Sequence, residues 1–402
     1  YAHQRAGETV QKAVNRFGLT HPVANDVDYV LWRRYGLRAW PSAVLLDVDG
    51  RPVATFTGEG RGTEIGQRVA ALLDDAARRD LRVFEPAAPV FVPEPRLPLA
   101  FPTRVLATEN HLYIADTGHH RVLEATHTGR VVRQFGSGEA ALRDGRESEA
   151  ALAEPQGLAL AGDKFYVADT GNHTIRCISL ADGKVDTVAG TGRVGRDRPD
   201  NHPDPASVSM CLPADLAAVG EQVFVVMSGQ NQIWRLDPHR RRIGVFAGSG
   251  KFGMNDGDAT YASFAEPAGI AALGLQLVVA DAGAEAIRVV RVADGRVETI
   301  AGGGPFTAGD ALGRRVNVRL QHPQGVAVDP HGLVFIADSY NQRIKAVNMR
   351  SGDVHVVNLD YALQQPEGLS VGAGALWIAN TNAHEIVRVD LASGDCRHVP
   401  VG

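Results

Sequence analysis

Six carboxylate, imidazole and amide side chains stand in polar turns, each of which begins at an Ala-Asp pair ending an apolar run. They are Asp116, His120, Asp169, His173, Asp338 and Asn341. Such groups can transfer protons, bind a metal ion or contact a partner. Their repetition argues against catalysis, because an enzyme does not need the same aspartate in several copies. We therefore expect the aspartates to cap turns, the histidines to be turn residues rather than metal ligands, and the turns to belong to a binding face.

Other motifs offer no metal or cofactor site. The sequence contains no His-Glu-x-x-His and no phosphate-binding glycine loop ahead of a helix. The segment NDGD at residues 255–258 is similar to the start of a calcium loop but lacks the later glutamate. The segment RDGR at residues 143–146 is equally well interpreted as a solvated turn. We expect neither a metal nor a cofactor.

Three cysteines limit the redox chemistry of the chain. Cys177, Cys211 and Cys396 are irregularly spaced and form neither a Cys-x-x-Cys pair nor a disulfide framework. Their small number favours a reducing compartment such as the cytoplasm. Because the chain begins with Tyr1 rather than Met, we expect a fragment whose localisation signals would lie upstream.

Composition excludes several classes of protein. The 402 residues are 44% apolar and include 44 glycines and 21 prolines, which are spread at intervals rather than gathered in one tract. This distribution is typical of many short strands separated by turns. The net charge of −5, without a long basic block, argues against nucleic acid or an anionic membrane as partner. No apolar stretch reaches the roughly 18 residues that a membrane span needs.

One pattern recurs six times and organises the last three quarters of the chain. Each copy starts at a proline, passes through an aliphatic strand and reaches an acidic or equivalent residue 14 or 15 positions later. The prolines are Pro102, Pro155, Pro213, Pro267, Pro323 and Pro366. The later positions are Asp116, Asp169, Met227, Asp281, Asp338 and Asn380. The distance from one proline to the next varies from 43 to 58 residues, so the variation must lie in one connection per copy.

Periodicity within a copy predicts four strands. In the second copy they are residues 157–160, 164–168, 174–179 and 184–189. Turns rich in Gly, Asn and Asp separate them. A four-stranded meander repeated six times predicts a mainly β fold, a six-bladed β-propeller over residues 101–402. Trp234 and Trp377 are then expected to pack between blades.

An up-and-down blade places its link to the next blade at the same end as the turn between its second and third strands. The long links are residues 137–154, 191–212, 249–266 and 303–322. Together with the polar turns they would crowd one face, which we call the loop-rich face. Loops on a rigid scaffold usually carry binding, so we expect a protein or peptide to bind there.

The repeat resembles the NHL repeat. Residues 168–176, with the sequence ADTGNHTIR, are similar to the signature that gives these repeats their name. Residues 115–121 and 337–345 match it well, while Met227 and the segment around Glu285 mark weaker copies.

The first 85 residues have a different pattern. Helical spacing over residues 8–17 precedes a short strand predicted at residues 21–24, and Asp26 is placed to cap a helix that ends near Arg34. A hairpin follows over residues 43–56, and then a helix over residues 63–79. This order indicates an α/β unit.

This segment resembles the later part of a thioredoxin-like domain. In that family a proline at the position of Pro41 is cis and faces the redox pair, so the resemblance makes Trp40 and Pro41 part of a redox groove. The family's Cys-x-x-Cys would precede Tyr1, so no catalytic residue is expected in this chain. We expect a partial thioredoxin-like domain at residues 1–83, a proline-rich linker at 84–100 and the propeller at 101–402. The order resembles the family of NHL repeat-containing protein 2, in a shorter, bacterial-type and N-terminally truncated form.

Two functions follow as hypotheses. The first is a monomeric protein-binding propeller attached to a thioredoxin-like module, with thiol-disulfide exchange only in the full-length parent. The alternative is a propeller hydrolase or lyase with a metal in its central channel. Three or more convergent carboxylate, amide or imidazole groups in the channel would favour the alternative.

Overall fold

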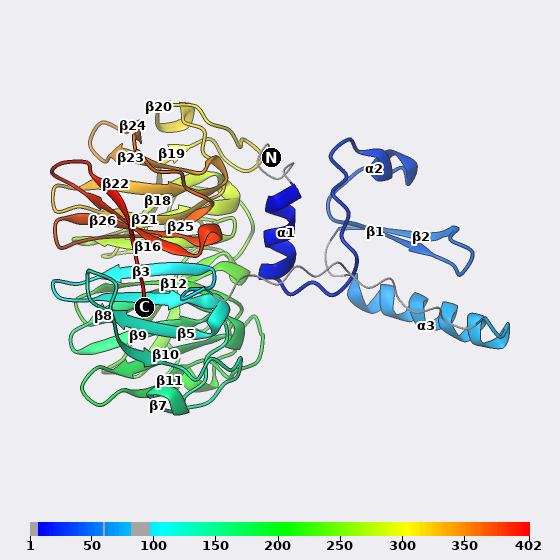
Figure 1. Ribbon diagram of the computed structural model, residues 1–402, viewed down its shortest axis with the longest axis horizontal. Coiled ribbons are helices and arrows are strands. Elements are labelled where there is room, and N and C mark those ends of the chain that lie inside the picture. The colour runs from blue at the N-terminus through cyan, green and yellow to red at the C-terminus, as the bar shows by residue number, and fades with distance from the viewer. Residues whose placement is uncertain (1–6, 59–60, 82–96) are drawn as a thin grey trace. The chain divides into compact units, whose positions relative to one another are not determined.

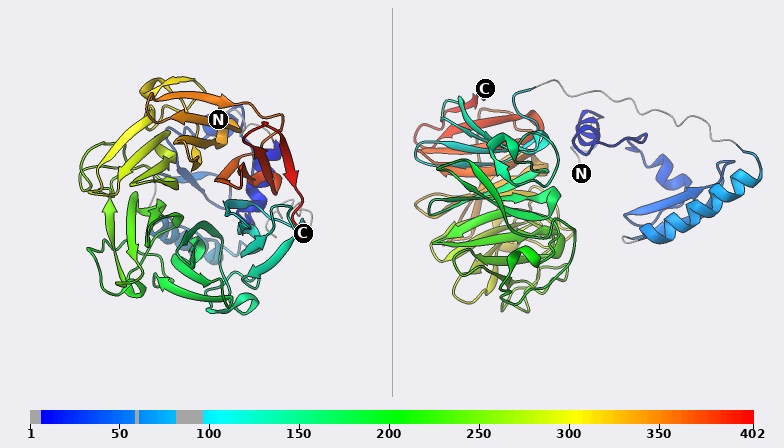
Figure 2. Two further views of the ribbon diagram at one scale, coloured as in Figure 1. Left: turned by 90° about the vertical axis from the view of Figure 1, so that its left-hand side faces the viewer. Right: turned by 90° about the horizontal axis from the view of Figure 1, so that it is seen from below.

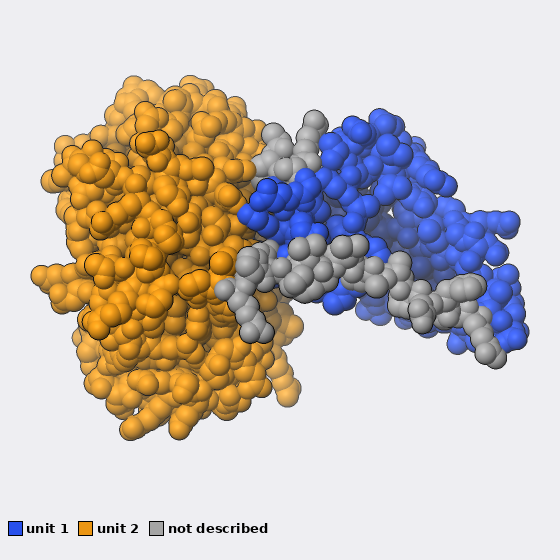
Figure 3. Space-filling model, viewed as in Figure 1, with its two compact units in different colours: residues 1–95 blue, residues 96–402 orange. Residues whose placement is uncertain are grey.

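The computed structural model describes residues 7–58, 61–81 and 97–402. It divides into two units, Tyr1–Pro95 and Arg96–Gly402 (Figure 3). The division falls within the linker predicted at residues 84–100, of which residues 84–96 lie outside the described ranges. No helix in the described ranges is long and apolar enough to cross a membrane.

The second unit is a ring of six antiparallel sheets around a central channel (Figures 1 and 2), so the predicted propeller is confirmed. Blade 1 consists of β3 (Pro102–Ala107), β4 (Leu112–Asp116), β5 (Arg121–Ala125) and β6 (Val131–Phe135). Blade 2 consists of β8 (Pro155–Ala161), β9 (Lys164–Asp169), β10 (Thr174–Ser179) and β11 (Lys184–Ala189). Blade 3 consists of β12 (Pro213–Val219), β13 (Gln222–Met227), β14 (Gln232–Asp237) and β15 (Arg242–Ala247).

The other three blades repeat this plan. Blade 4 consists of β16 (Pro267–Leu273), β17 (Gln276–Asp281), β18 (Ala286–Arg291) and β19 (Val297–Gly302). Blade 5 consists of β21 (Pro323–Val328), β22 (Leu333–Asp338), β23 (Arg343–Asn348) and β24 (Asp353–Val357). Blade 6 consists of β25 (Pro366–Gly372), β26 (Ala375–Asn380), β27 (Glu385–Asp390) and β28 (Cys396–Val399). Two link strands, β7 (Gly145–Arg146) and β20 (Gly313–Arg314), add a fifth, outermost strand to blades 2 and 5.

The core lies between blades rather than within them. Six clusters of buried apolar side chains each join two neighbouring blades, and one of them joins blade 6 to blade 1. Trp234 and Trp377 are fully buried in two of these clusters, as predicted. Every blade forms its four strands from one continuous segment. The chain end also spans the last seam, because Gly402 N donates to Gly129 O of blade 1 (3.1 Å) and Val401 is buried beside it.

The first unit contains α1 (Gly7–Arg16), α2 (Val30–Arg34), a hairpin of β1 (Ser42–Leu46) and β2 (Pro52–Thr57), and α3 (Gly62–Arg78). Asp26 caps α2 as predicted, since its carboxylate accepts the N–H groups of Val30, Leu31 and Trp32. The strand predicted at residues 21–24 is wrong. That segment has no strand to pair with among the described residues, and an unpaired strand leaves its backbone groups unsatisfied.

Candidate binding face and central channel

The predicted aspartates end the second strand of their blades and hold the preceding link. In blade 2, Asp169 Oδ1 accepts Ala153 N (2.7 Å), and Asp116 and Asp338 accept Ala100 N and Gln321 N in the same way. All three carboxylates are fully buried. Their role in capping the polar turns is therefore structural, and a partner on the surface cannot reach them.

In three blades, a basic residue seven positions after the aspartate also binds the preceding link. We call this ion-paired group the link anchor. In blade 2, Arg176 is fully buried and pairs with Asp169 (2.8 Å) and with Asp144 in the link (2.7 Å). Burial raises the pKa of the Asp169 carboxyl, and its hydrogen bonds and Arg176 oppose that rise. Blades 4 and 5 contain the same arrangement, in Asp281–Arg288–Asp256 and Asp338–Lys345–Asp310.

These anchors give two link motifs a structural role. Asp144 of the RDGR segment and Asp256 of the NDGD segment are half-exposed, and they pair with the fully buried Arg176 and Arg288. The sequence carried a signal for both, since a basic residue lies seven positions after three of the aspartates. Blade 3 has Met227 and Trp234 at these two positions, both fully buried.

The turn histidines join neighbouring blades. His120 Nδ1 accepts Glu154 N (3.1 Å), and His173 Nδ1 accepts Leu212 N (3.3 Å), in each case just before the next blade's first proline. Burial lowers the pKa of both imidazoles, which keeps each Nδ1 available as an acceptor. Asn231 makes the same bond in blade 3, to Glu266 N (2.8 Å).

Asn341 also serves the turn. Its Nδ2 donates to Asp338 Oδ2 (2.8 Å) and to Gly309 O in the link (2.8 Å), as Asn172 does in blade 2. The three aspartates thus support the loop-rich face from beneath, while His120, His173 and Asn341 hold its turns and links and are partly exposed. The large exposed apolar side chains on this face are those of the links.

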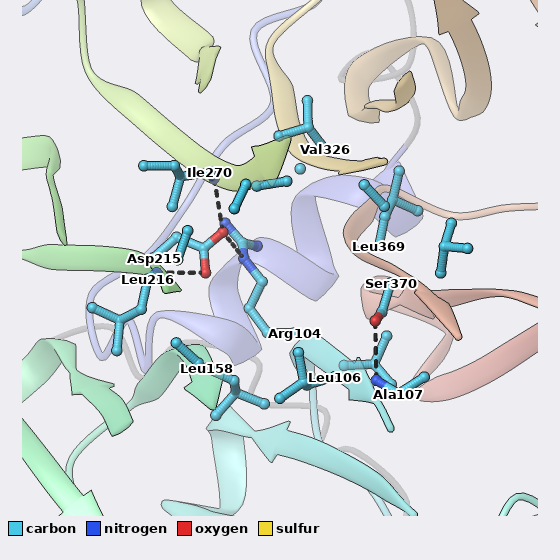
Figure 4. Close-up of a pocket in the computed structure, with 18 of the residues that line it drawn as sticks. Arg104, Leu106, Ala107, Leu158, Asp215, Leu216, Ile270, Val326, Leu369 and Ser370 are labelled. Atoms are coloured by element: carbon cyan, nitrogen blue, oxygen red, sulfur yellow. Dashed lines mark hydrogen bonds and ion pairs between the residues drawn. The ribbon is translucent and has the colours of Figure 1, made fainter. Parts of the chain in front are cut away.

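The central channel contains an ion pair that joins two blades that are not neighbours in the ring. Arg104 Nε of blade 1 lies 3.0 Å from Asp215 Oδ2 of blade 3, and both side chains are buried (Figure 4). Arg104 also donates to Ala268 O and Gln324 O of blades 4 and 5. The pair bounds a cavity of about 340 Å³ that continues along the inner strands away from the loop-rich face.

Arg104 and Asp215 replace glycine at one repeat position. It is the second residue after the blade proline, and the other four blades have Gly157, Gly269, Gly325 and Gly368. A Cβ on Gly325 would lie 2.0 Å from Glu367 O, and one on Gly368 2.5 Å from Thr103 O, so neighbouring blades leave no room for it. Aligning the six blade prolines identifies both exceptions, Arg104 and Asp215, in the sequence.

The channel does not fit the metal-dependent alternative. Its lining residues are mostly aliphatic, Asp215 is the one acidic residue among them, and none is His, Asn or Glu. In the described ranges no three His, Cys, Asp or Glu side chains converge as a metal site.

Residues 368–372 read Gly-Leu-Ser-Val-Gly, a match to the Gly-x-Ser-x-Gly pattern of serine hydrolases that sequence reasoning missed. The motif requires a turn between a strand and a helix, whereas these residues lie within strand β25. Ser370 Oγ accepts Ala107 N (3.0 Å) of blade 1. This serine therefore joins two inner strands.

In the first unit, the peptide bond between Trp40 and Pro41 is cis. The Trp40 side chain is 77% exposed and stacks on Trp32, with ring centroids 4.6 Å apart. The three cysteines lie in the propeller as free thiols, and burial raises the pKa of Cys177 and Cys396, which disfavours the reactive thiolate.

Comparison with known sequences identifies the repeat. The family model described as NHL repeat matches residues 152–178 and 320–347, which cover the first three strands of blades 2 and 5 except for the last residue of the third strand. Blades 2 and 5 are therefore NHL repeats within the six-bladed ring. The resemblance stated from the sequence is confirmed for this part of the chain.

Two relatives extend along nearly the whole chain. NHL repeat-containing protein 2 of Homo sapiens is 31% identical over 455 residues, covering 100% of this chain and 62% of the human protein. Protein SUPPRESSOR OF QUENCHING 1, chloroplastic, of Arabidopsis thaliana is 32% identical over 427 residues, covering 96% of this chain and 40% of that protein. The chain thus spans less than two thirds of the length of either relative.

A solved structure supports the fold alone. A protein of unknown function from Bacteroides thetaiotaomicron superposes with a TM-score of 0.53 at 14% identity, covering 72% of this chain and 68% of that one.

Proposed function

We propose that this chain is a binding scaffold whose NHL propeller engages a protein or peptide through its loop-rich face. The observation that carries the proposal is the exposure of large apolar side chains on the long links. They are Leu142, Val194, Phe252, Tyr261, Phe306, Leu312 and Val316. Apolar side chains gathered on one face of a protein are characteristic of protein interaction sites.

The links also have the rigidity that binding favours. Ion pairs with the buried Arg176, Arg288 and Lys345 hold three of them. A surface that is already ordered loses little conformational entropy when a partner binds, so more of the contact energy appears as affinity.

Site-specific photo-crosslinking tests this proposal. A photoreactive phenylalanine analogue placed at Phe306, on a link, should crosslink to a partner in cells. The matched control is the same analogue at Leu275, which is 69% exposed in the turn between β16 and β17 on the opposite face. Crosslinks from Leu275 but not from Phe306 would place the partner on the wrong face and overturn the proposal.

We also propose that the first unit is the later part of a thioredoxin-like module that is redox-active only in the full-length parent. Trp40 and Pro41 would shape its substrate groove. Among the described residues of this unit, Val14, Phe56 and Ala76 are the buried apolar ones, and its sheet has two strands. A hairpin of this size is not stable on its own, so further elements are needed to complete the unit.

The upstream coding sequence decides this second proposal. A Cys-x-x-Cys or a single Cys encoded some tens of residues before Trp40 would supply the nucleophile. If no cysteine is encoded there, thiol-disulfide chemistry is excluded, while the binding proposal is unaffected.

A further inference from the structure

Four long links begin with the same short pattern. After the last strand of blades 1 to 4, the chain has a glycine, then a second glycine two residues later, then an apolar residue two residues after that. The apolar residues are Ala140, Val194, Phe252 and Phe306. The side chain at this repeat position therefore grows from methyl to isopropyl to benzyl around the ring.

The backbone at this position is fixed while the larger side chains face solvent. Val194 forms a parallel bridge with Met210, and Phe252 forms one with Phe264, so the next blade's entry segment holds each link. The side chains of Val194, Phe252 and Phe306 are nevertheless 65%, 52% and 96% exposed. Packing of the link does not explain why these residues are large, since Ala140 occupies the same position.

The links that carry these residues are in contact with one another. Arg198 of the second link donates to Ser249 O of the third link. A Cβ on Gly304 of the fourth link would lie 3.5 Å from Met254 Cε of the third. The three apolar residues thus belong to links that touch one another on the loop-rich face, where exposed apolar side chains are characteristic of interaction sites.

Cations flank this surface. Arg193, Arg196, Arg198 and Lys251 lie within four residues of Val194 or Phe252, and no ion pair is formed by any of them among the described residues. Within four residues of the three apolar side chains, the acidic groups are already engaged. Asp256 and Asp310 pair with Arg288 and Lys345, and the Asp197 carboxylate, which keeps its negative charge, accepts Ser209 N.

We propose that Val194, Phe252 and Phe306, with Arg193 and Lys251 beside them, form the docking surface for an acidic peptide segment that carries aromatic or branched apolar side chains. This inference rests on the proposed binding role of the loop-rich face and names the chemistry of its partner. Apolar side chains of the peptide contact the three link residues and supply most of the affinity, as anchors do at protein interfaces. Its carboxylates pair with the exposed cations and orient the segment.

Selection from a library of random peptides displayed on phage, against the immobilised full chain, tests the inference. Enriched peptides should combine Asp or Glu with Phe, Tyr, Trp, Leu, Ile or Val. Their binding should weaken roughly tenfold or more in the variant Phe252→Ser/Phe306→Ser. It should also weaken in Arg193→Ser/Lys251→Ser and fall as salt is raised.

Two control variants carry the same changes on the opposite face. Leu275→Ser removes an exposed apolar side chain, and Arg130→Ser removes an exposed cation from the turn between β5 and β6. Neither should alter binding. All of these positions are exposed, so the variants are expected to keep the fold, which circular dichroism checks.

The remaining outcomes separate this inference from the proposed function. If the enriched peptides are neutral or basic and their binding requires Phe252 and Phe306, the acidic partner is overturned while the proposed binding role of the loop-rich face is retained. Binding that is insensitive to every link variant, or no enrichment at all, would overturn both. Concentration-dependent self-association abolished by Phe252→Ser/Phe306→Ser would assign the surface to a second copy of the chain and overturn the peptide partner.

Discussion

Arg104 and Asp215 occupy the same repeat position in blades 1 and 3, and they meet as a buried ion pair inside the channel at 3.0 Å. The four other blades have glycine there. Two charged side chains therefore fill the space that the glycines leave and join blades that are not neighbours. The pair lies in the wall of a cavity whose other lining residues are mostly aliphatic.

Replacing one partner of this ion pair should lower the free energy of unfolding more than replacing both partners. Asp215→Asn leaves the Arg104 charge buried without its partner, so we expect a loss of about 3 to 5 kcal/mol in the free energy of unfolding. The double variant Arg104→Met/Asp215→Asn should lose less than the sum of the two single variants. Urea unfolding of the four proteins measures this coupling. Strict additivity of the two losses would show that the pair does not contribute as a unit.

The two aspartates in the link anchor of blade 2 should contribute unequally to the free energy of unfolding. Asp169→Ala removes a fully buried partner of Arg176, and we expect a loss of about 3 to 5 kcal/mol. Asp144→Ala removes a half-exposed partner of the same arginine, and we expect about 1 kcal/mol. Unfolding midpoints and the rate of proteolysis within residues 137–154 measure the two effects. Equal losses would contradict the assignment of Asp169 as the main anchor.

His120 and His173 should make stability depend on pH. Burial lowers the pKa of both in the folded chain below the value of 6.5 that an unperturbed histidine has. Below about pH 6.5 the unfolded chain therefore binds more protons than the folded chain, so stability falls as pH decreases and is constant above that range. His120→Asn/His173→Asn should flatten this dependence, since Asn231 already accepts the equivalent bond. Thermal unfolding from pH 8 to pH 5 is the measurement, and an unchanged slope would refute the role of these histidines.

Gly325→Ala should destabilise the propeller through sterics alone. Its Cβ would lie 2.0 Å from Glu367 O of the next blade, so the inner strands must separate, at a cost of about 1 to 3 kcal/mol. Gly66→Ala in α3 is the control, because a Cβ there meets no atom within 4 Å. Differential scanning calorimetry of both variants should show a lower transition temperature for Gly325→Ala only.

Local patterns in the sequence predict the propeller closely. The constant distance from proline to Asp169 and its counterparts, with Gly and Asn in the turns, predicts six blades and places the strands of blade 2 within two residues of their bounds. These features depend on neighbours along the chain. The wrong prediction of a strand at residues 21–24 shows where local patterns are insufficient, because a strand also needs a partner strand from elsewhere in the chain.

For the candidate site, too, local sequence patterns predict some features and the tertiary structure decides the others. Sequence alone determined which residues form the turns and which segments are the long links, since turn chemistry and strand periodicity are local properties. Only the tertiary structure decided that Asp169 is buried against Arg176, that His120 reaches the next blade, and that Val194, Phe252 and Phe306 are exposed. The physical reason is ring closure. Arg104 and Asp215 come together only when six sheets close around one axis, and no local pattern specifies which side chains then face each other, the solvent or the core.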